Sequence, residues 1–152
     1  MRRWILYSLA ALGILFLPKG QEVDIGSLIP VELIHIYKEQ DRIMVTTETG
    51  DSGNGTTLEK ALEDLRATAF GVVFLDTVEY VLVTEESKDL VAELKSHFRL
   101  STNVILATAP IDTEKALQFL AIHNPEVTLK DHLVLGTKLP KFMKAGDRYY
   151  VE

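Results

Sequence analysis

The sequence contains no cysteine among its 152 residues. This absence excludes disulfides, thiolate metal ligands and cysteine nucleophiles. It also excludes a lipid anchor of the bacterial lipoprotein kind, because that anchor is attached to a cysteine at the cleavage point. It does not fix the redox compartment, since a chain without cysteine is compatible with either side of a membrane.

Basic residues are fewer than acidic ones, with 16 Lys and Arg against 22 Asp and Glu and a formal net charge of −6. We therefore do not expect a general nucleic-acid-binding protein, because proteins of that class need a basic face to displace counterions. The excess of acidic residues lies between Glu22 and Thr128, a range that contains 8 basic and 19 acidic residues. The tail after Thr128 has 5 basic and 3 acidic residues. Either this is ordinary solvated charge, or the tail contacts an acidic partner or lipid headgroups. The basic residues concerned are Lys138, Lys141, Lys144 and Arg148.

The first twenty residues have the pattern of a targeting segment. Arg2 and Arg3 precede an uncharged apolar run from Trp4 to Leu17. This run suits the hydrophobic region of a signal peptide and is short for a full membrane span of roughly 20 residues. No small residue is well placed for cleavage after Leu17. An uncleaved signal-anchor helix, a cleaved signal peptide and a buried core helix all remain open. In the first two cases the basic start places the rest of the chain on the extracytoplasmic face.

The remainder, residues 21–152, has the length and the 47% hydrophobic content of a single domain. The sequence pattern for helices and strands is less clear in the C-terminal tail, which starts at residue 125. Two β-branched stretches, Leu28–Tyr37 and Arg42–Thr49, predict a hairpin with a four-residue turn. Three helices and two further strands are expected after them. The order β-β-α-β-α-β-α predicts an α/β fold with a mixed sheet of about four to five strands and three helices.

The first helix is predicted to follow a glycine-rich loop, Gly50–Gly55. Thr56 is the expected N-cap, and Glu59 three residues later completes a capping box. The apolar positions of this helix recur with helical spacing. They are Leu58, Ala61, Leu62 and Leu65.

The next two helices and the strands around them follow from similar signals. We expect one main strand around Tyr80, entered through a turn near Asp76, and a buried strand at Val104–Thr108. Ser87 and Asp112 are the expected caps of the second and third helices, and Asn124-Pro125 ends the third. The expected inward residues are Leu90, Val91, Leu94 and Phe98 in the second helix, and Ala116, Leu117, Leu120 and Ala121 in the third.

Two short elements are expected in the tail. His132–Leu135 reads as an added edge strand. Lys141–Val151 either forms a small hairpin about Ala145-Gly146-Asp147 or stays irregular.

The loop before the first helix is the best candidate for a ligand or partner contact. Backbone N–H groups and the helix dipole attract anions at such a position. The lysine of a phosphate-binding loop is absent, however, and the acidic spacing of a calcium-binding loop is not met. We therefore expect either a plain connecting loop or a weak contact site. The contact residues would be Gly50, Asp51, Gly53, Asn54, Gly55 and Thr56.

No pattern predicts a catalytic, cofactor-binding or metal-binding residue. The histidines lie on separate predicted elements, which does not suit a metal pair. Adjacent acidic pairs, Glu63-Asp64 and Glu85-Glu86, point to different faces and do not form a catalytic carboxylate pair. The histidines are His35, His97, His123 and His132.

Several stretches between Asp24 and about Leu120 resemble the N-terminal domain of the spore germinant-receptor C-subunit family, the Ger(x)C-type lipoproteins. The first is the paired-strand opening from Asp24 to Thr49. The others are the helix Thr57–Leu65, the strand with acidic turn Val78–Glu86, and the strand Arg99–Ala107. The chain departs from the family in having no cysteine to carry the lipid, and a single domain is expected where family members continue into further ones.

The resemblance implies a non-enzymatic, membrane-tethered extracytoplasmic domain that assembles with other membrane protein subunits. Its membrane contact would be the N-terminal segment, and no nucleic acid is expected as a partner. The alternative expectation is a small-ligand or anion sensor that uses the glycine-rich loop.

Overall fold

The computed structural model describes residues 28–97, 103–110, 116–146 and 148–152. The predicted signal or anchor helix, Phe98 and the Asp112 cap lie outside these residues. Within them, no helix has both the length and the apolar character needed to cross a membrane.

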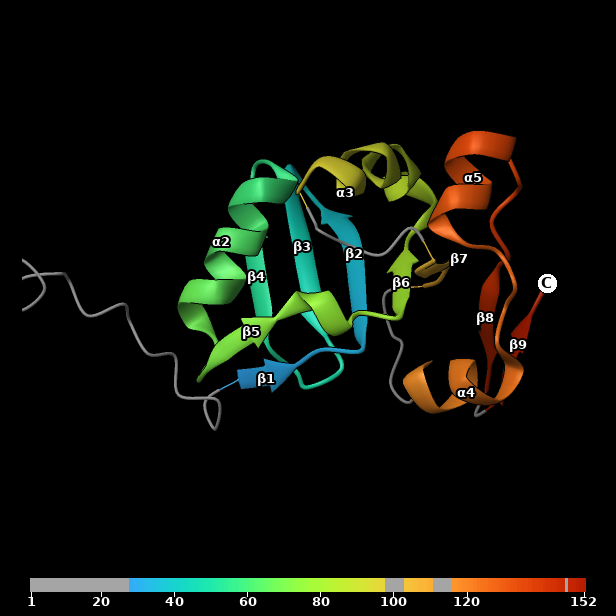
Figure 1. Ribbon diagram of the computed structural model, residues 1–152, viewed down its shortest axis with the longest axis horizontal. Helices are drawn as coiled ribbons and strands as arrows, with labels where there is room; N and C mark the ends of the chain where they lie inside the picture. Colours follow the sequence, from blue (N-terminus) through green and yellow to red (C-terminus); the bar gives the residue numbers. More distant parts are fainter. Residues whose placement is uncertain (1–27, 98–102, 111–115, 147) are drawn as a thin grey trace, which may run out of the picture.

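A five-stranded mixed sheet forms the centre of the molecule (Figure 1). Its spatial order is β4-β3-β2-β6-β7, in which β2, β6 and β7 are parallel and β2, β3 and β4 are antiparallel neighbours. The prediction of a mixed sheet with parallel pairs and a hairpin is therefore confirmed. The strands are β2 (Leu33–Glu39), β3 (Arg42–Thr47), β4 (Ser52–Gly55), β6 (Tyr80–Val83) and β7 (Ile105–Thr108).

Four α-helices, rather than the expected three, are present in the described residues. They are α2 (Leu58–Thr68), α3 (Val91–His97), α4 (Ala116–His123) and α5 (Leu129–Leu135). The prediction of an edge strand at His132–Leu135 is wrong, because these residues belong to α5. A complete capping box starts that helix, since Thr128 and Asp131 each accept the other's backbone N–H.

The described residues also form two small sheets and two 3-10 helices. Of the two alternatives for Lys141–Val151, the hairpin is the one that forms, whereas the parallel pair β1–β5 was not expected. The strands are β1 (Leu28–Pro30), β5 (Val72–Phe74), β8 (Phe142–Ala145) and β9 (Arg148–Val151), and the 3-10 helices are η2 (Leu75–Thr77) and η3 (Glu85–Leu90).

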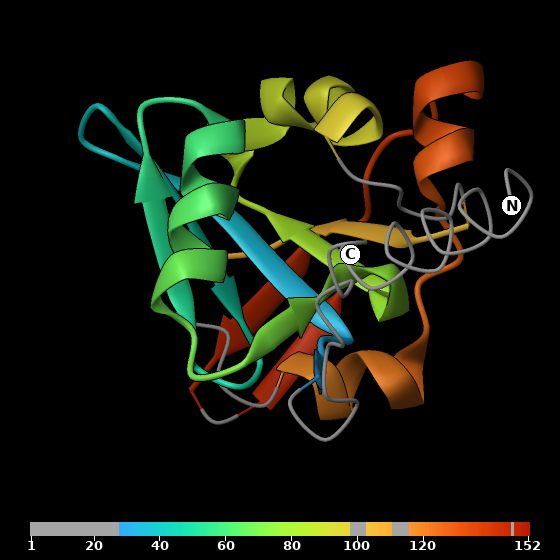
Figure 2. The same ribbon diagram turned by 60° about the vertical axis from the view of Figure 1, so that its left-hand side comes forward.

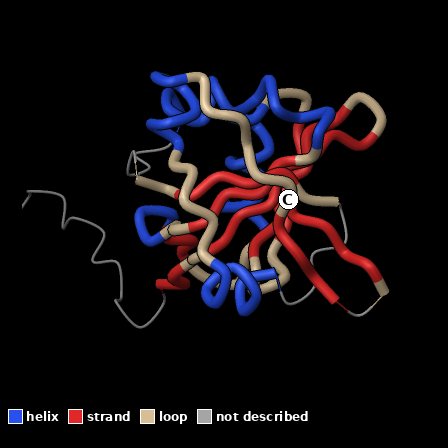
Figure 3. Tube along the Cα trace, turned by 90° about the vertical axis from the view of Figure 1, so that its right-hand side faces the viewer, coloured by secondary structure: helices blue, strands red, loops and turns tan. Residues whose placement is uncertain are grey.

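Each face of the central sheet carries its own hydrophobic core. On one face, alternate strand residues such as Ile34, Val45 and Val81 pack with α2, α3 and the first residue of α5. On the other, Leu33 and Leu82 pack with α4 and the C-terminal hairpin. Helices accordingly lie on both sides of the strands in Figure 3, and the hairpin lies across the sheet from α2 in Figure 2. Successive residues of each strand therefore point alternately into the two hydrophobic cores.

The segment predicted as a loop, Gly50–Gly55, forms a hairpin with β3 instead. Its last four residues are the edge strand β4, which pairs with β3 from Ile43 to Thr46. Gly53 and Gly55 face α2 at very short range. A Cβ atom at Gly53 would lie 2.2 Å from the carbonyl oxygen of Ala61, and one at Gly55 would lie 2.5 Å from the Ala61 nitrogen. Both glycines are required because the helix backbone rests directly on the strand backbone.

Helix α2 starts one residue later than predicted. Thr57, not Thr56, has the extended N-cap backbone, and its hydroxyl accepts the N–H of Lys60 at 3.3 Å. The third helical position is therefore Lys60, so Glu59 does not complete a capping box. The predicted apolar face of the helix is confirmed, since all four of its residues are buried: Leu58, Ala61, Leu62 and Leu65.

The predicted strand Leu28–Tyr37 is broken into β1 and β2. Pro30, expected near the start of one strand, is the last residue of β1, and the Val31 N–H still donates to the Phe74 carbonyl at 3.3 Å. The Glu48 carboxylate then accepts the backbone N–H groups of Glu32 and Leu33 at 2.7 and 3.1 Å, which turns the chain into β2. The turn after β2 is also shorter than predicted, with only Gln40 and Asp41 between the strands.

The outer edge of β7, the last strand of the parallel half of the sheet, is covered by other backbone segments. The Leu106 N–H donates to the Val127 carbonyl at 2.9 Å, and the Thr108 N–H donates to the Pro140 carbonyl at 2.8 Å. Two separate segments of the C-terminal tail therefore cover the outer edge of β7.

We predict that Gly53→Ala destabilises the protein by about 2 to 3 kcal/mol, because the added methyl group forces α2 away from β4. Chemical denaturation measures this loss. Ser52→Ala is the matched control, since Ser52 is exposed on the same strand. Equal stability of the two variants would contradict the close approach.

Candidate functional site

A cavity of about 470 Å³ lies at the carboxyl end of the parallel strands, against the C-terminal hairpin. In open α/β sheets this end of the strands is where ligands usually bind. The location of the cavity follows from the fold alone, so any function of the cavity has to be argued from the side chains that line it. The cavity is lined by Lys38, Thr84, Glu85, Glu86, Thr108, Ala109, Pro110, Lys141, Phe142, Met143 and Lys144.

Three neighbouring strands position the polar part of this lining. Lys38 is near the end of β2, Thr84 directly follows β6, and Thr108 ends β7. The Thr108 hydroxyl donates to the Pro140 carbonyl at 3.3 Å, in addition to the backbone bond to the same oxygen. This double contact joins β7 to the chain that enters β8, where the fully buried Phe142 lies. The hairpin and the sheet together enclose the cavity.

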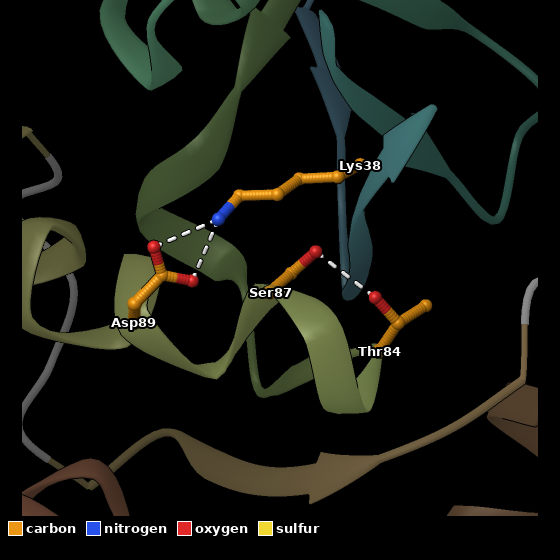
Figure 4. A network of polar contacts seen from close by, with 4 residues as sticks. All are labelled: Lys38, Thr84, Ser87 and Asp89. Carbon is orange, nitrogen blue, oxygen red and sulfur yellow. Dashed lines mark hydrogen bonds and ion pairs between the residues drawn. The ribbon is translucent and has the colours of Figure 1, made fainter. Parts of the chain in front are cut away.

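The predicted helix cap Ser87 has a different role. Thr84 is the residue before the 3-10 helix η3, and Ser87 is buried inside it. The Thr84 hydroxyl donates to the Ser87 Oγ at 2.9 Å, as Figure 4 shows. This bond closes the turn between β6 and η3, so Ser87 stabilises the cavity wall rather than starting a helix.

Ion pairs surround the cavity. The Lys38 ammonium lies 2.9 and 2.7 Å from the two carboxylate oxygens of Asp89 (Figure 4). This hydrogen bond holds the pKa of Asp89 below its usual value. Glu85 pairs with Lys88 at 2.5 Å, and the pKa of Glu85 is lowered by that bond, with smaller contributions from Thr108 and Lys141. Because these groups are largely exposed, each pair adds little stability.

The cavity suits the binding of a small amphipathic molecule. Apolar atoms come from Ala109, Pro110, Phe142 and Met143, while hydroxyl, ammonium and carboxylate groups lie among them. Among the described residues, no histidine lines the cavity, and the hydroxyl groups of Thr84 and Ser87 bond to each other. What the described lining offers is a binding pocket.

Only three of the six residues predicted to contact a ligand lie together at one surface site. Asn54, Gly55 and Thr56 line a surface depression together with residues of α2. The polar groups there engage one another, since the Asp64 carboxylate accepts both the backbone and the side-chain N–H of Asn54 at 2.9 Å. The Arg42 guanidinium donates to the Asn54 amide oxygen.

The other three predicted contact residues do not line this depression. Gly50 and Asp51 lie in the hairpin turn, and Gly53 is buried under α2. The Asp51 carboxylate accepts the Thr49 hydroxyl at 2.8 Å. A ligand contact at these six residues stays a prediction.

The described histidines are dispersed. His35 is 2% exposed on the α4 face of the sheet, where its Nε2 has no hydrogen-bond partner. Burial lowers the pKa of His35 to about 4. His123 packs on Phe119, and the His132 ring contacts the Thr137 carbonyl. No cluster of three metal-ligating side chains occurs in the ranges that the structure describes.

Sequence reasoning missed the cavity because its lining comes from four separate segments. A usable signal was present, since Thr84 directly follows the strand predicted around Tyr80, and Thr108 ends the strand predicted to be buried. Parallel strands bring such ends together at one edge of the sheet. The contribution of the C-terminal hairpin was not readable, because its packing against β7 depends on contacts between residues more than 30 positions apart.

No protein-family model matches the chain, and no curated protein or solved structure is similar to it.

We predict that the protein loses stability as the pH falls from about 6.5 to about 4. In this range the unfolded state binds a proton at His35 while the folded state does not, because burial lowers the pKa of that side chain. The shift corresponds to about 3 kcal/mol. Denaturation midpoints measured between pH 8 and pH 4 test this prediction.

The His35→Leu variant should lose most of this acid sensitivity, because an apolar side chain in the same place has no proton to bind. The exposed His123→Asn is the matched control and should keep the sensitivity of the parent protein. An unchanged pH profile in His35→Leu would rule out His35 as the cause.

Proposed function

We propose that this protein is a non-enzymatic, membrane-tethered extracytoplasmic domain, similar to a spore germination receptor subunit, that acts by assembling with other membrane protein subunits. The tether would be the apolar segment Trp4–Leu17. The resemblance to the germinant-receptor C-subunits supports the assembly role. The observation that carries it is an exposed apolar surface on α5.

Helix α5 leaves most of its apolar residues in solvent. Leu133 is 38% exposed, Val134 70% and Leu135 73%, and these three residues are consecutive. Leu129 is the one buried residue of this helix. The capping box at Thr128 and the left-handed Gly136 define both ends of the helix that carries this surface. An ordered apolar surface of this kind is typical of a protein interface.

In Figure 1, α5 lies at the end of the molecule away from β1, where the chain enters the described fold. A partner bound to α5 would therefore not compete with a tether that leads into β1.

Site-specific photo-cross-linking in the native membrane tests the proposal. A photoreactive residue in place of Val134 should give a discrete adduct with an integral membrane protein. The same residue in place of Glu63, on the exposed polar side of α2, should give none. Equal cross-linking at the two positions would count against α5 as the interface. Recovery of the full chain in the soluble fraction would count against the tether.

A second candidate function is the binding of a small molecule. The glycine-rich loop is one place for such a contact, although four of its six residues belong to β4. The cavity between the sheet and the C-terminal hairpin supports it better, since it combines an apolar lining with the exposed Lys141 ammonium.

The amphipathic anion 8-anilinonaphthalene-1-sulfonate is a suitable probe of this cavity. Its fluorescence should saturate at one site per chain, and Lys141→Glu should weaken the binding roughly fivefold through charge repulsion. Lys130→Glu is the matched control, because Lys130 is exposed on α5 and does not line the cavity. Equal affinities of the two variants would place the probe elsewhere.

A further inference from the structure

The two-stranded sheet β1–β5 presents an apolar face to solvent. Phe70 is fully exposed, Val72 is 45% exposed and Phe74 is 39% exposed. These residues alternate along the chain, whereas Val73 between them is buried in the core. Because alternate residues of a strand point to opposite faces, Val72 and Phe74 share the outer face of the sheet.

Strand β1 extends the same face. Its register pairs Leu28 with Val72 and Pro30 with Phe74, and parallel partners lie on the same side of a sheet. Leu28 is half-buried and Pro30 is exposed. These four residues, and the fully exposed Phe70 in the bend just before β5, form what we call the β1–β5 face. It contains two aromatic rings and no charged side chain.

The position of this face in the chain is its second distinctive property. Leu28 is the first described residue, and only Pro18 to Ser27 separate it from the apolar run that ends at Leu17. Ten residues span at most about 35 Å when fully extended. The β1–β5 face is therefore tied more closely to the N-terminal apolar segment than any other surface of the fold.

We propose that the β1–β5 face rests on the lipid surface of the membrane that holds the N-terminal segment. This inference depends on the tether of the proposed function and adds an orientation to it. Phenylalanine and aliphatic side chains partition into the boundary between headgroups and acyl chains. A tether within reach keeps the face at the membrane, so even weak partitioning orients the domain.

The charge of the chain indicates which lipids are involved. Residues between Glu22 and Thr128 contain 8 basic and 19 acidic side chains, so anionic headgroups would repel this part of the chain. The contact is apolar rather than electrostatic. It should therefore form on zwitterionic phosphatidylcholine at least as well as on anionic phosphatidylglycerol, and it should persist in high salt.

The absence of cysteine makes a direct test practical. Val72→Cys and, as the matched control, Glu63→Cys each give the full-length chain a single site for an environment-sensitive fluorophore. Both positions are exposed, so the label does not disturb the core. The chains are reconstituted into phosphatidylcholine vesicles, and resistance to carbonate extraction establishes that the tether is in place. Quenching is then measured with a lipid-borne nitroxide and, separately, with aqueous iodide.

The lipid nitroxide should quench the label of Val72→Cys at least about threefold more than that of Glu63→Cys, and iodide should show the reverse order. Replacing both Phe70 and Phe74 with serine should abolish the difference, because each phenylalanine contributes roughly a tenfold factor to partitioning.

Three results would overturn the proposal. One is quenching of the Val72→Cys label by iodide as strongly as that of the control. Another is protection of this label from both quenchers, which would mean that protein covers the face. The third is a difference that survives replacement of both phenylalanines. A chain released by carbonate would instead refute the tether, and thereby the proposed function itself.

Discussion

The close contact between α2 and β4 is the constraint on which the rest of the fold depends. Two glycines let the helix backbone approach the strand to a distance that no side chain permits. Leu58 and Leu65 then lie deep in the first core, beside Ile36 and Val45. The end of α2 leads directly into β5, so the glycine contact also sets where the β1–β5 sheet lies. A structural need thus accounts for the glycines that resembled a ligand-binding loop.

The sequence predicted those parts of the fold that rest on local periodicity. The apolar stripe of α2 and the continuous run at β7 were recognised because burial imposes a clear pattern on each. Strand β4 was missed because Ser52 to Gly55 has almost no β-forming residue, and its pairing depends on the helix above it. Helix α5 was missed for the opposite reason. Its residues His132 to Leu135 look like a strand, and the decisive signal was the short-range pair Thr128 and Asp131.

The candidate site was less predictable than the fold, because it is assembled from residues far apart in the chain. Thr84 and Thr108 become neighbours only through the pairing of β6 with β7. The cavity then closes only when the chain near Pro140 bonds to Thr108. The same limit applies to the buried His35. The sequence pattern placed it in a strand, but it did not predict that a second hydrophobic core covers the side of the sheet on which His35 lies. Predictions from a single sequence reach local elements, whereas sites arise from tertiary contacts.

The double cover on the outer edge of β7 also bears on how the chain folds during its synthesis. Val127 and Pro140 supply the bonds that occupy this edge, and both follow the end of β7 in the chain by 19 residues or more. Until they emerge from the ribosome, β7 has an open row of N–H and carbonyl groups that another strand can pair with. The nascent domain is therefore prone to aggregation between the synthesis of β7 and that of Pro140. A chain truncated before Pro140 would keep that vulnerability permanently.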